Sequence, residues 1–464
     1  MNLLIYNTLT HQIENFIPID PTNVSIYSCG PTVYSRQHLG NLRAAYFVDL
    51  LKNTIKHIVG YPVTHVMNIT DVGHLTGDNE GDADHGEDRM EKGARQQGIT
   101  ARDVAKKFTN IYQEDLQLLH IDDFEYMPKA TDHITEQIAM VQDLEVKGYT
   151  YVIPGDGVYM DTSKVSDYGI LTNQKHIDNI SSGSRVHDAG KKNPTDFALR
   201  KFNITGKKRD MERDSPWGVG FPGWHIECSA MSMKYLGNHI DIHTGGMEHI
   251  AIHHTNEICQ SECAGAHHPW VNYRVHLQRL MMNGKKIAKS DGNVAFLNEV
   301  IEKGYTPEDL RYFYLQAHYR SFQDFTRESL EAAKKGRLSL KKKIQSQGLL
   351  SNDTITELHT ILCHDLNTPK LLAQLHLVGC PPQLDEHVLK LGLFESESGS
   401  KNIIIPDEIQ RIANQRWEAK SKKDRGLSDQ LRDQLKTQGR IMKDGKESFE
   451  LVFDPNIVTN TRHF

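Results

Sequence analysis

Four side chains that can bind a soft metal ion lie far apart along this chain, and they constrain its fold more than any other feature. They are Cys29, Cys228, His253 and Glu257. His253 and Glu257 are four positions apart, so one helix would present both on the same face. Two thiolates, an imidazole and a carboxylate form a donor set that suits zinc. Such widely spaced ligands meet only inside a folded core, and the carboxylate favours a catalytic or substrate-binding site over a structural one.

Spacing alone does not establish a metal site. Buried cysteines are usually inert thiols, and a His and a Glu four positions apart usually form a surface pair. The three histidines His243, His249 and His254 are expected near the same site, where they would tune the ionisation of a thiol or support the ligands. A purely structural role for these histidines stays open. The weight of the metal hypothesis therefore depends on the segments around these residues.

The first such segment predicts the beginning of a nucleotide-binding parallel sheet. The alternation in Val24–Ser28 predicts a strand that ends just before Cys29. Apolar residues spaced from Ala44 to Ile55 predict a helix that opens near Leu39, and a second strand is expected near Val63–Ile69. The start of such a helix exposes unpaired N–H groups, which suit a phosphate.

Two residues at this helix start have a chemical interpretation. His38 could donate a hydrogen bond to a phosphate oxygen as charge develops on it. Gly40 has no Cβ, so a flat base could lie directly on the backbone there. The alternative is an ordinary strand–turn–helix with a glycine in the turn and an exposed histidine.

A second segment, from Gly284 to Gly292, is rich in lysine. Lys285, Lys286 and Lys289 lie between glycines that permit the segment to move, and three lysines could clamp a polyphosphate. A solvated basic loop is the alternative interpretation of the same pattern.

Taken together, these segments resemble the two signatures of class I aminoacyl-tRNA synthetases. His38-Leu39-Gly40-Asn41 resembles HIGH, and Lys286-Ile287-Ala288-Lys289-Ser290 resembles KMSKS, in the same order. Further segments narrow the resemblance to the cysteinyl-tRNA synthetase family: YNTLT, CGPTVY, MNITDVGHL, PWGVGFPGWHIECSAM, DIHTGG, HHTNEICQSE, VNYRVH and LRYFYLQAHYRS. The resemblance covers nearly the whole chain and weakens after about residue 330.

The resemblance implies an α/β fold of the class I synthetase Rossmann type and a reaction that joins L-cysteine to tRNA(Cys) at the expense of ATP. It implies one Zn²⁺ per chain, held by Cys29, Cys228, His253 and Glu257, and Mg²⁺ with ATP. It places ATP against His38, Gly40, Asn41, Lys286 and Lys289, and the cysteine side chain against Trp224 and Thr70. Two departures bear on this assignment: Asn41 stands where HIGH ends in His, and Ile287 and Ala288 replace Met and Ser of KMSKS.

Length and composition agree with a globular chain of about three domains. We expect a catalytic domain at 1–320, with a connective insertion at about 98–220 and the lysine loop at 284–292, a helical bundle at 321–400 and a small anticodon-binding segment at 401–464. The chain has 464 residues and a mean hydropathy of −0.54. We expect no membrane partner, no cleaved signal peptide and no disulfide framework, and hence a cytoplasmic monomer. An acidic stretch from Asp78 to Glu91 is interpreted as a solvated insertion.

The C-terminal segment is locally basic although the whole chain carries a net charge of −6. Residues 411–446 contain 11 Lys and Arg against 5 Asp and Glu. An aromatic residue among cations suits RNA stacking and phosphate contact. The residues concerned are Arg416, Trp417, Lys420, Lys422, Lys423 and Arg425. A solvated helical hairpin with Trp417 in its core explains the same pattern, and the family resemblance favours contact with tRNA.

Two other functions remain open at this stage. One is a cysteine ligase of mycothiol synthesis, which shares the catalytic half, acylates an amino-sugar and is shorter at its C-terminus. The other is a tRNA-binding paralogue that has lost catalysis, for which the altered lysine signature is the sole support. Pyrophosphate exchange with cysteine distinguishes the paralogue from both enzymes, and the identity of the acyl acceptor distinguishes the two enzymes from each other.

Overall fold

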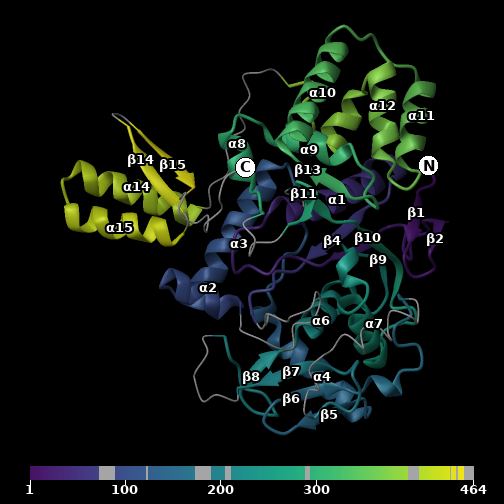
Figure 1. Ribbon diagram of the computed structural model, residues 1–464, viewed down its shortest axis with the longest axis vertical. Coiled ribbons are helices and arrows are strands. Elements are labelled where there is room, and N and C mark those ends of the chain that lie inside the picture. The colour runs from purple at the N-terminus through teal and green to yellow at the C-terminus, as the bar shows by residue number, and fades with distance from the viewer. Residues whose placement is uncertain are drawn as a thin grey trace.

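The computed structural model describes residues 1–72, 89–121, 124–172, 190–203, 211–287, 293–395, 407–438, 440–445 and 448–453. Lys289 and the acidic stretch from Asp78 to Asp88 lie outside these described residues. Figure 1 shows helices at one end of the long axis, a parallel sheet in the middle, an antiparallel sheet at the other end and a small C-terminal module at one side. None of the helices in the described ranges is both long enough and apolar enough to cross a bilayer.

Within the described ranges, a four-stranded parallel sheet with the order β10-β9-β3-β4 forms the centre of the fold. Its strands are β3 (Val24–Ser28), β4 (Val63–Met67), β9 (Ile240–Gly246) and β10 (Val271–Leu277). Every residue of β3 is buried, as in parallel sheets that are covered on both faces. The strands predicted at 24–28 and near 63–69, and the α/β class with a parallel sheet, are confirmed.

Three helices carry the predicted site residues against this sheet. They are α1 (Leu39–Thr54), α6 (Trp224–Leu236) and α7 (His253–Cys263). α1 begins at the predicted residue, and α7 holds both His253 and Glu257, so the prediction that one helix presents this pair is confirmed. Helix α6 packs against β3, β4 and α7.

The region between β4 and α6 divides between two hydrophobic cores. Its elements are α2 (Arg89–Gln97), α3 (Ala101–Leu118), α4 (Ile134–Val146), β5 (Thr150–Ile153), β6 (Gly157–Met160), β7 (Phe197–Phe202) and β8 (Gly220–Pro222). Helices α2 and α3 pack into the same core as α1. Helix α4 and strands β6 and β7 of the antiparallel sheet β5-β6-β7-β8 form a separate core at the lower end of Figure 1, together with apolar residues of α6 and α7.

The chain after β10 forms a small sheet and then a group of helices. These elements are β11 (Leu280–Met282), β12 (Lys285–Lys286), α8 (Leu297–Glu302), α9 (Pro307–Leu315), β13 (Gln323–Phe325), α10 (Arg327–Gln345), α11 (Asn352–Leu362), α12 (Thr368–Val378) and α13 (Pro382–Leu384). The N-terminal hairpin of β1 (Leu4–Asn7) and β2 (Gln12–Asn15) lies beside this group, where the Leu4 N–H donates to the Cys363 carbonyl. The predominantly helical character predicted beyond residue 321 is confirmed.

A compact C-terminal module follows, made of α14 (Asp407–Ser421), α15 (Arg425–Thr437), β14 (Arg440–Asp444) and β15 (Phe449–Phe453). The two helices agree with the predicted basic helix pair, whereas the β-hairpin was not anticipated. The module contacts α3 through an ion pair between Arg440 and Glu114, whose side chains are both buried, and through a hydrogen bond from Asn110 to Gln438. Figure 1 shows the module in yellow at the side of α3.

Candidate active site

A cleft of about 500 Å³ opens at the carboxyl ends of the parallel strands. Cys29 follows β3, Thr70 follows β4 and Gln278 follows β10, and all three line the cleft. In open α/β sheets, ligands bind at this edge because the loops that leave the strands diverge there. The cleft is therefore the place where the fold brings together residues that are distant in the sequence.

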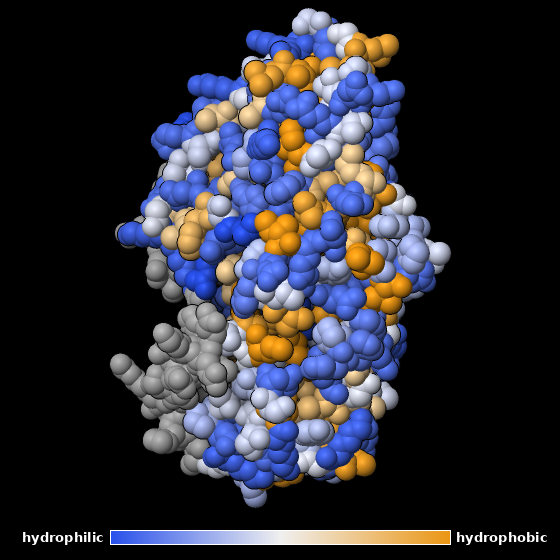
Figure 2. Space-filling model, turned by 90° about the vertical axis from the view of Figure 1, so that its right-hand side faces the viewer, coloured by the Kyte–Doolittle hydropathy of each residue, from blue (hydrophilic) through white to orange (hydrophobic). Residues whose placement is uncertain are grey.

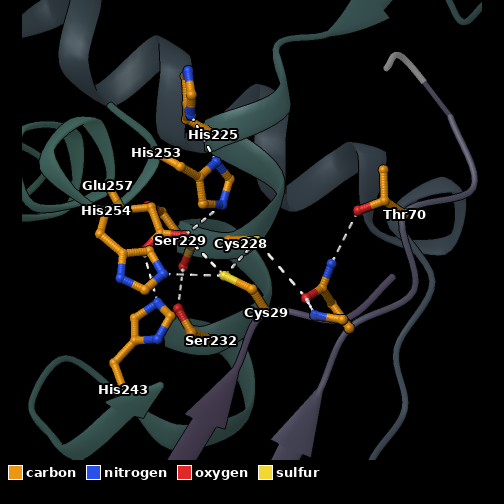
Figure 3. Close-up of polar contacts among 12 residues, drawn as sticks. Cys29, Thr70, His225, Cys228, Ser229, Ser232, His243, His253, His254 and Glu257 are labelled. Carbon is orange, nitrogen blue, oxygen red and sulfur yellow. Dashed lines mark hydrogen bonds and ion pairs between the residues drawn. The ribbon is translucent and has the colours of Figure 1, made fainter. Parts of the chain in front are cut away.

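The four predicted metal ligands meet at one wall of this cleft (Figure 3). The Cys29 sulfur lies 4.0 Å from the Cys228 sulfur and 3.7 Å from Glu257 Oε1. His253 Nε2 lies 3.0 Å from the same oxygen. Cys228, His253 and Glu257 are almost fully buried, and Cys29 is partly exposed toward the cleft.

This arrangement fits a divalent metal ion. Ligands placed tetrahedrally around zinc, at bonds of about 2.0–2.3 Å, stand roughly 3.3–3.8 Å apart, close to the separations observed here. Neighbouring histidines hold two of the donors in place: His225 Nδ1 lies 2.8 Å from His253 Nδ1, and His243 Nε2 lies 2.7 Å from Glu257 Oε2. These contacts turn His253 Nε2 and Glu257 Oε1 toward the sulfurs, as supporting residues do around bound metals. The four residues could thus bind a metal.

A second, overlapping set shares Cys29 and Glu257 and replaces the other two residues with His243 and His254. His254 Nε2 lies 3.4 Å from the Cys29 sulfur, while its Nδ1 lies 2.7 Å from His276 Nε2. This set contains one thiol, so it is the harder donor set and suits zinc less well. His249 lines the cleft at the same wall, with its ring edge-on to Trp224 at 6.1 Å between centroids.

The ionisation of the cluster favours a cation. Burial raises the pKa of the Cys29 thiol well above its usual value, whereas the hydrogen bond with Cys29 lowers the pKa of Cys228 to about 7. Cys228 is therefore the sulfur that ionises first. Burial opposes ionisation of Glu257, but His243 and His253 hold the pKa of this carboxyl well below its usual range. Negative charge is thus concentrated on buried sulfur and oxygen atoms, which a divalent cation would neutralise.

His38 is the N-cap of α1 and lines the same cleft. Its Nδ1 accepts a hydrogen bond from the Asn41 backbone N–H at 3.2 Å, and Asn41 Oδ1 accepts one from the His38 backbone N–H at 3.3 Å. In the neutral imidazole the proton then resides on Nε2, which can donate to an anion. A Cβ on Gly40 would stand 3.0 Å from the His38 ring, so Gly40 leaves room for this ring beside the helix start.

The beginning of the lysine loop lies over the same helix. Lys286 and Ile287 line the cleft, and Ile287 Cδ1 would be 3.5 Å from a Cβ on Gly40. Ile287 also packs against the main core, which anchors the beginning of the loop. Lys289, the lysine expected to contact the ATP phosphates, lies outside the described residues.

Both residues expected to contact the cysteine side chain line the cleft. Trp224 is the first residue of α6, and its ring centroid lies 4.3 Å from that of His253. Thr70 accepts a hydrogen bond from the Asn68 side chain at 3.2 Å. Figure 3 shows Thr70 on the opposite side of Cys29 and Cys228 from the histidines.

Comparison with known proteins identifies the family. Residues 15–335 match the model of the tRNA synthetases class I (C) catalytic domain. A cysteine–tRNA ligase of Treponema denticola is 39% identical over 491 residues, which cover 96% of this chain and 98% of that protein. Cysteine–tRNA ligase 1 of Burkholderia lata is 40% identical over 463 residues, which cover 97% of each chain.

The chain belongs to the cysteine–tRNA ligase family. The predicted family resemblance is therefore confirmed. The structure of Mycobacterium tuberculosis methionyl-tRNA synthetase in complex with methionyl-adenylate matches over 90% of this chain and 89% of that chain, with a TM-score of 0.55 and 11% identity. At this identity the likeness concerns the fold, and it confirms the class I synthetase architecture.

In this member of the family, the C-terminal cations that we expected to contact tRNA divide into two groups. Arg416 is buried and forms a bidentate ion pair with Asp444, at 2.7 and 3.2 Å. Trp417 is half-buried and packs against the core of the module, with its ring centroid 5.7 Å from that of Phe449. Four other cations are exposed: Lys420, which contacts Asp444, Lys422, which contacts Glu418, and Lys423 and Arg425.

Sequence reasoning missed two residues that support the site. Asn68 Oδ1 accepts from the Gly30 N–H at 2.8 Å and lies 3.8 Å from the Cys228 sulfur, while its amide donates to Thr70. Asn68 therefore joins the loop after β3, α6 and the loop after β4. His225 fixes the orientation of His253, as described above. Their positions in the segments MNIT and GWHIEC, next to residues already selected, are the signal that could have identified them.

Proposed function

We propose that the chain is a zinc-dependent cysteine–tRNA ligase that activates L-cysteine with ATP and transfers it to tRNA(Cys). One observation carries the proposal: Cys29, Cys228 and His253 line the same cleft as the start of α1 at His38, and Glu257 completes their cluster from a fully buried position. A thiol-selective site and a phosphate-binding helix start are the two parts that cysteinyl-adenylate formation needs. Relatives that carry this activity in their names match over nearly the whole chain.

Cys29, Cys228, His253 and Glu257 would hold one Zn²⁺, which supplies a soft Lewis acid that prefers the thiolate of cysteine to the hydroxyl of serine. A hydrophobic pocket alone discriminates poorly between such similar side chains. Trp224 would cover the cysteine side chain from the beginning of α6, where its ring lies tilted against that of His253. Thr70 would close the pocket from the loop after β4.

The ATP phosphates, with their Mg²⁺, would lie at the start of α1. The positive end of the α1 dipole favours anions there. His38 Nε2 would donate to a phosphate oxygen, and Lys286 and Lys289 would approach from the lysine loop. The reciprocal caps between His38 and Asn41 hold the imidazole in the required orientation.

The proposed reaction requires no covalent intermediate with the protein. A carboxylate oxygen of cysteine attacks the α-phosphorus of ATP, and the bond to the β-phosphate breaks, releasing pyrophosphate. The terminal ribose hydroxyl of tRNA(Cys) then attacks the carbonyl of the adenylate, and AMP leaves. Positioning of the two reactants and stabilisation of the phosphate charge by His38 and the lysines carry the first step.

The C-terminal module would contact tRNA(Cys) through its exposed cations. Lys420, Lys422, Lys423 and Arg425 are suited to this role because they are exposed. Arg416 and Trp417 would act indirectly, since their side chains already hold the module together. Phosphate contacts of this kind make binding weaker at high salt.

Two assays test the proposed function together. Pyrophosphate exchange should depend on L-cysteine, which would exclude a paralogue without catalysis. The purified chain should then load cysteine onto tRNA(Cys) and leave an amino-sugar acceptor unmodified. Exchange without transfer to tRNA, together with acylation of the amino-sugar, would contradict the proposal and favour the amino-sugar ligase.

A further inference from the structure

A buried arginine stands behind the cysteine-rich cluster. Arg274 lies in β10, is 1% exposed, and its guanidinium lies over the Trp270 ring at 5.3 Å from the centroid. Within the described residues, neither of its terminal nitrogens has a hydrogen-bond partner. A guanidinium carries its charge at any physiological pH, so this position holds a permanent buried cation.

The nearest opposite charge is one of the predicted metal ligands. Arg274 Nη1 lies 3.9 Å from Glu257 Oε2, the oxygen that also accepts from His243 at 2.7 Å. The other oxygen of Glu257 faces His253 and Cys29. Arg274 therefore approaches the carboxylate from the side away from the sulfurs, where it can influence the cluster without occupying a ligand position.

The charge of the cluster explains why a cation is tolerated there. A buried charge without hydrogen bonds is costly unless opposite charges offset it. Two thiolates and a carboxylate carry three negative charges, and a divalent metal ion leaves one of them uncompensated. Binding the thiolate of a substrate would add another negative charge to the same buried volume. The positive charge of Arg274 offsets one of these charges without consuming a donor atom.

We infer that Arg274 is a positioning residue for the substrate thiolate: its charge compensates the cluster, so that the site accepts a further anionic sulfur. The inference rests on the proposed function, because it requires that a metal and a thiolate bind at this cluster. Arg274 does not touch the substrate in this account. It acts on the substrate through Glu257 and the field of its charge.

This role predicts effects of opposite sign on the metal and on the substrate. A cation near the cluster repels Zn²⁺ and attracts a thiolate. Removing the charge should therefore leave metal retention unchanged or increased, while cysteine binds more weakly. An arginine that merely packs against Trp270 would instead weaken both metal and cysteine binding when it is replaced, together with the stability of the fold.

The test compares Arg274→Met, which keeps the length and removes the charge, with Arg274→Lys, which keeps the charge. Arg274→Gln is a second neutral variant that retains polarity in case the Met variant does not fold. Arg200→Met is the matched control, because Arg200 is also a buried strand arginine but lies in the antiparallel sheet. Cobalt-loaded protein gives a readout independent of activity, since thiolate binding adds sulfur-to-cobalt charge-transfer absorption.

For the neutral variants we expect the dissociation constant of L-cysteine, read from this absorption, to rise on the order of tenfold, with retention of the metal against a chelator at least as strong as in the wild type. The Lys and Arg200→Met variants should bind cysteine like the wild type. Unchanged cysteine affinity in the neutral variants would overturn the inference, and so would loss of the metal together with cysteine. If the wild-type cobalt protein does not respond to cysteine, the proposed function itself fails.

Discussion

His38 Nδ1 accepts a hydrogen bond from the Asn41 backbone N–H at 3.2 Å, and Asn41 Oδ1 accepts one from the His38 backbone N–H. One pair of residues thus caps α1 and fixes the tautomer of the imidazole that faces the cleft. Asn41 stands where the family signature has a second histidine. Its role here is to complete the cap, which a short amide does well at a helix start.

Replacing His38 by Asn separates the capping role from the chemical one. Asn is among the best N-cap residues, so His38→Asn should change the free energy of unfolding by less than about 0.5 kcal/mol. It removes the Nε2 donor, so kcat for pyrophosphate exchange should fall about 100-fold. Thermal unfolding and exchange kinetics measure the two effects. Wild-type exchange in His38→Asn would contradict a role for this imidazole in phosphate binding.

The lysine loop should act on the transition state of adenylate formation. Lys289→Ala should lower kcat of this step, with a smaller effect on KM for ATP, because the charge is needed most as the phosphate bond breaks. Lys285→Ala, an exposed lysine at the beginning of the loop, is the control. If Lys289→Ala leaves exchange intact, Lys286 is the better candidate, since it lines the cleft.

Trp224 should matter for cysteine more than for ATP. Its ring packs beside His253, and Trp224→Ala would open the wall of the proposed cysteine pocket. KM for cysteine should rise about tenfold, with KM for ATP nearly unchanged. Trp217→Ala is the matched control, because Trp217 packs against the core of the antiparallel sheet. A larger rise in KM for ATP than for cysteine would reject the assignment.

The exposed cations of the C-terminal module should carry its affinity for tRNA. Changing Lys422, Lys423 and Arg425 to Gln should weaken binding and flatten its dependence on salt, as the loss of phosphate contacts requires. Trp417→Ala should instead destabilise the module by about 1.5–3 kcal/mol, because the half-buried ring packs against its core. Binding titrations at several salt concentrations, with thermal unfolding in parallel, measure both effects. An unchanged salt slope would contradict tRNA contact by these three cations.

Deleting residues from 400 onward should spare pyrophosphate exchange and abolish most aminoacylation. The polar stretch at Ser396–Lys401 suggests few long-range apolar contacts across this boundary. A polar contact does cross it, because Arg440 forms a buried ion pair with Glu114 on α3. The truncation would therefore leave Glu114 without its partner. A second truncated variant that also carries Glu114→Gln has no unpaired carboxylate at this position. A carboxylate that stays buried without its partner lowers the free energy of unfolding by about 3–5 kcal/mol. Full aminoacylation by the truncated chain would show that the module is not the part that binds tRNA.

Local patterns were enough to predict the elements that frame the site. The alternation at Val24–Ser28 and the apolar spacing after Leu39 placed β3 and α1, and the four-residue spacing placed His253 and Glu257 on α7. These predictions depend on periodicity within a single element, which sequence carries directly.

Contacts between distant segments could not be predicted in this way. The spacing of residues does not indicate that Arg274 lies 3.9 Å from Glu257. It also does not indicate that Asn68 joins the loops after β3 and β4 to Cys228 on α6. Likewise, the basic composition after residue 411 could not show that Arg416 forms an ion pair with Asp444. Asp444 lies in a β-hairpin that forms only in the folded module. Tertiary packing, and not local preference, determines these contacts.

We propose that the cluster at Cys29, Cys228, His253 and Glu257 selects a thiol through a bound metal. The dissociation constants of L-cysteine and L-serine for the zinc-loaded protein test this selection. Serine should bind at least about 100-fold more weakly than cysteine, since a hydroxyl is a poor zinc ligand, and this preference should be lost in Cys228→Ser. Serine that binds the zinc-loaded wild type as tightly as cysteine would contradict selection by the metal.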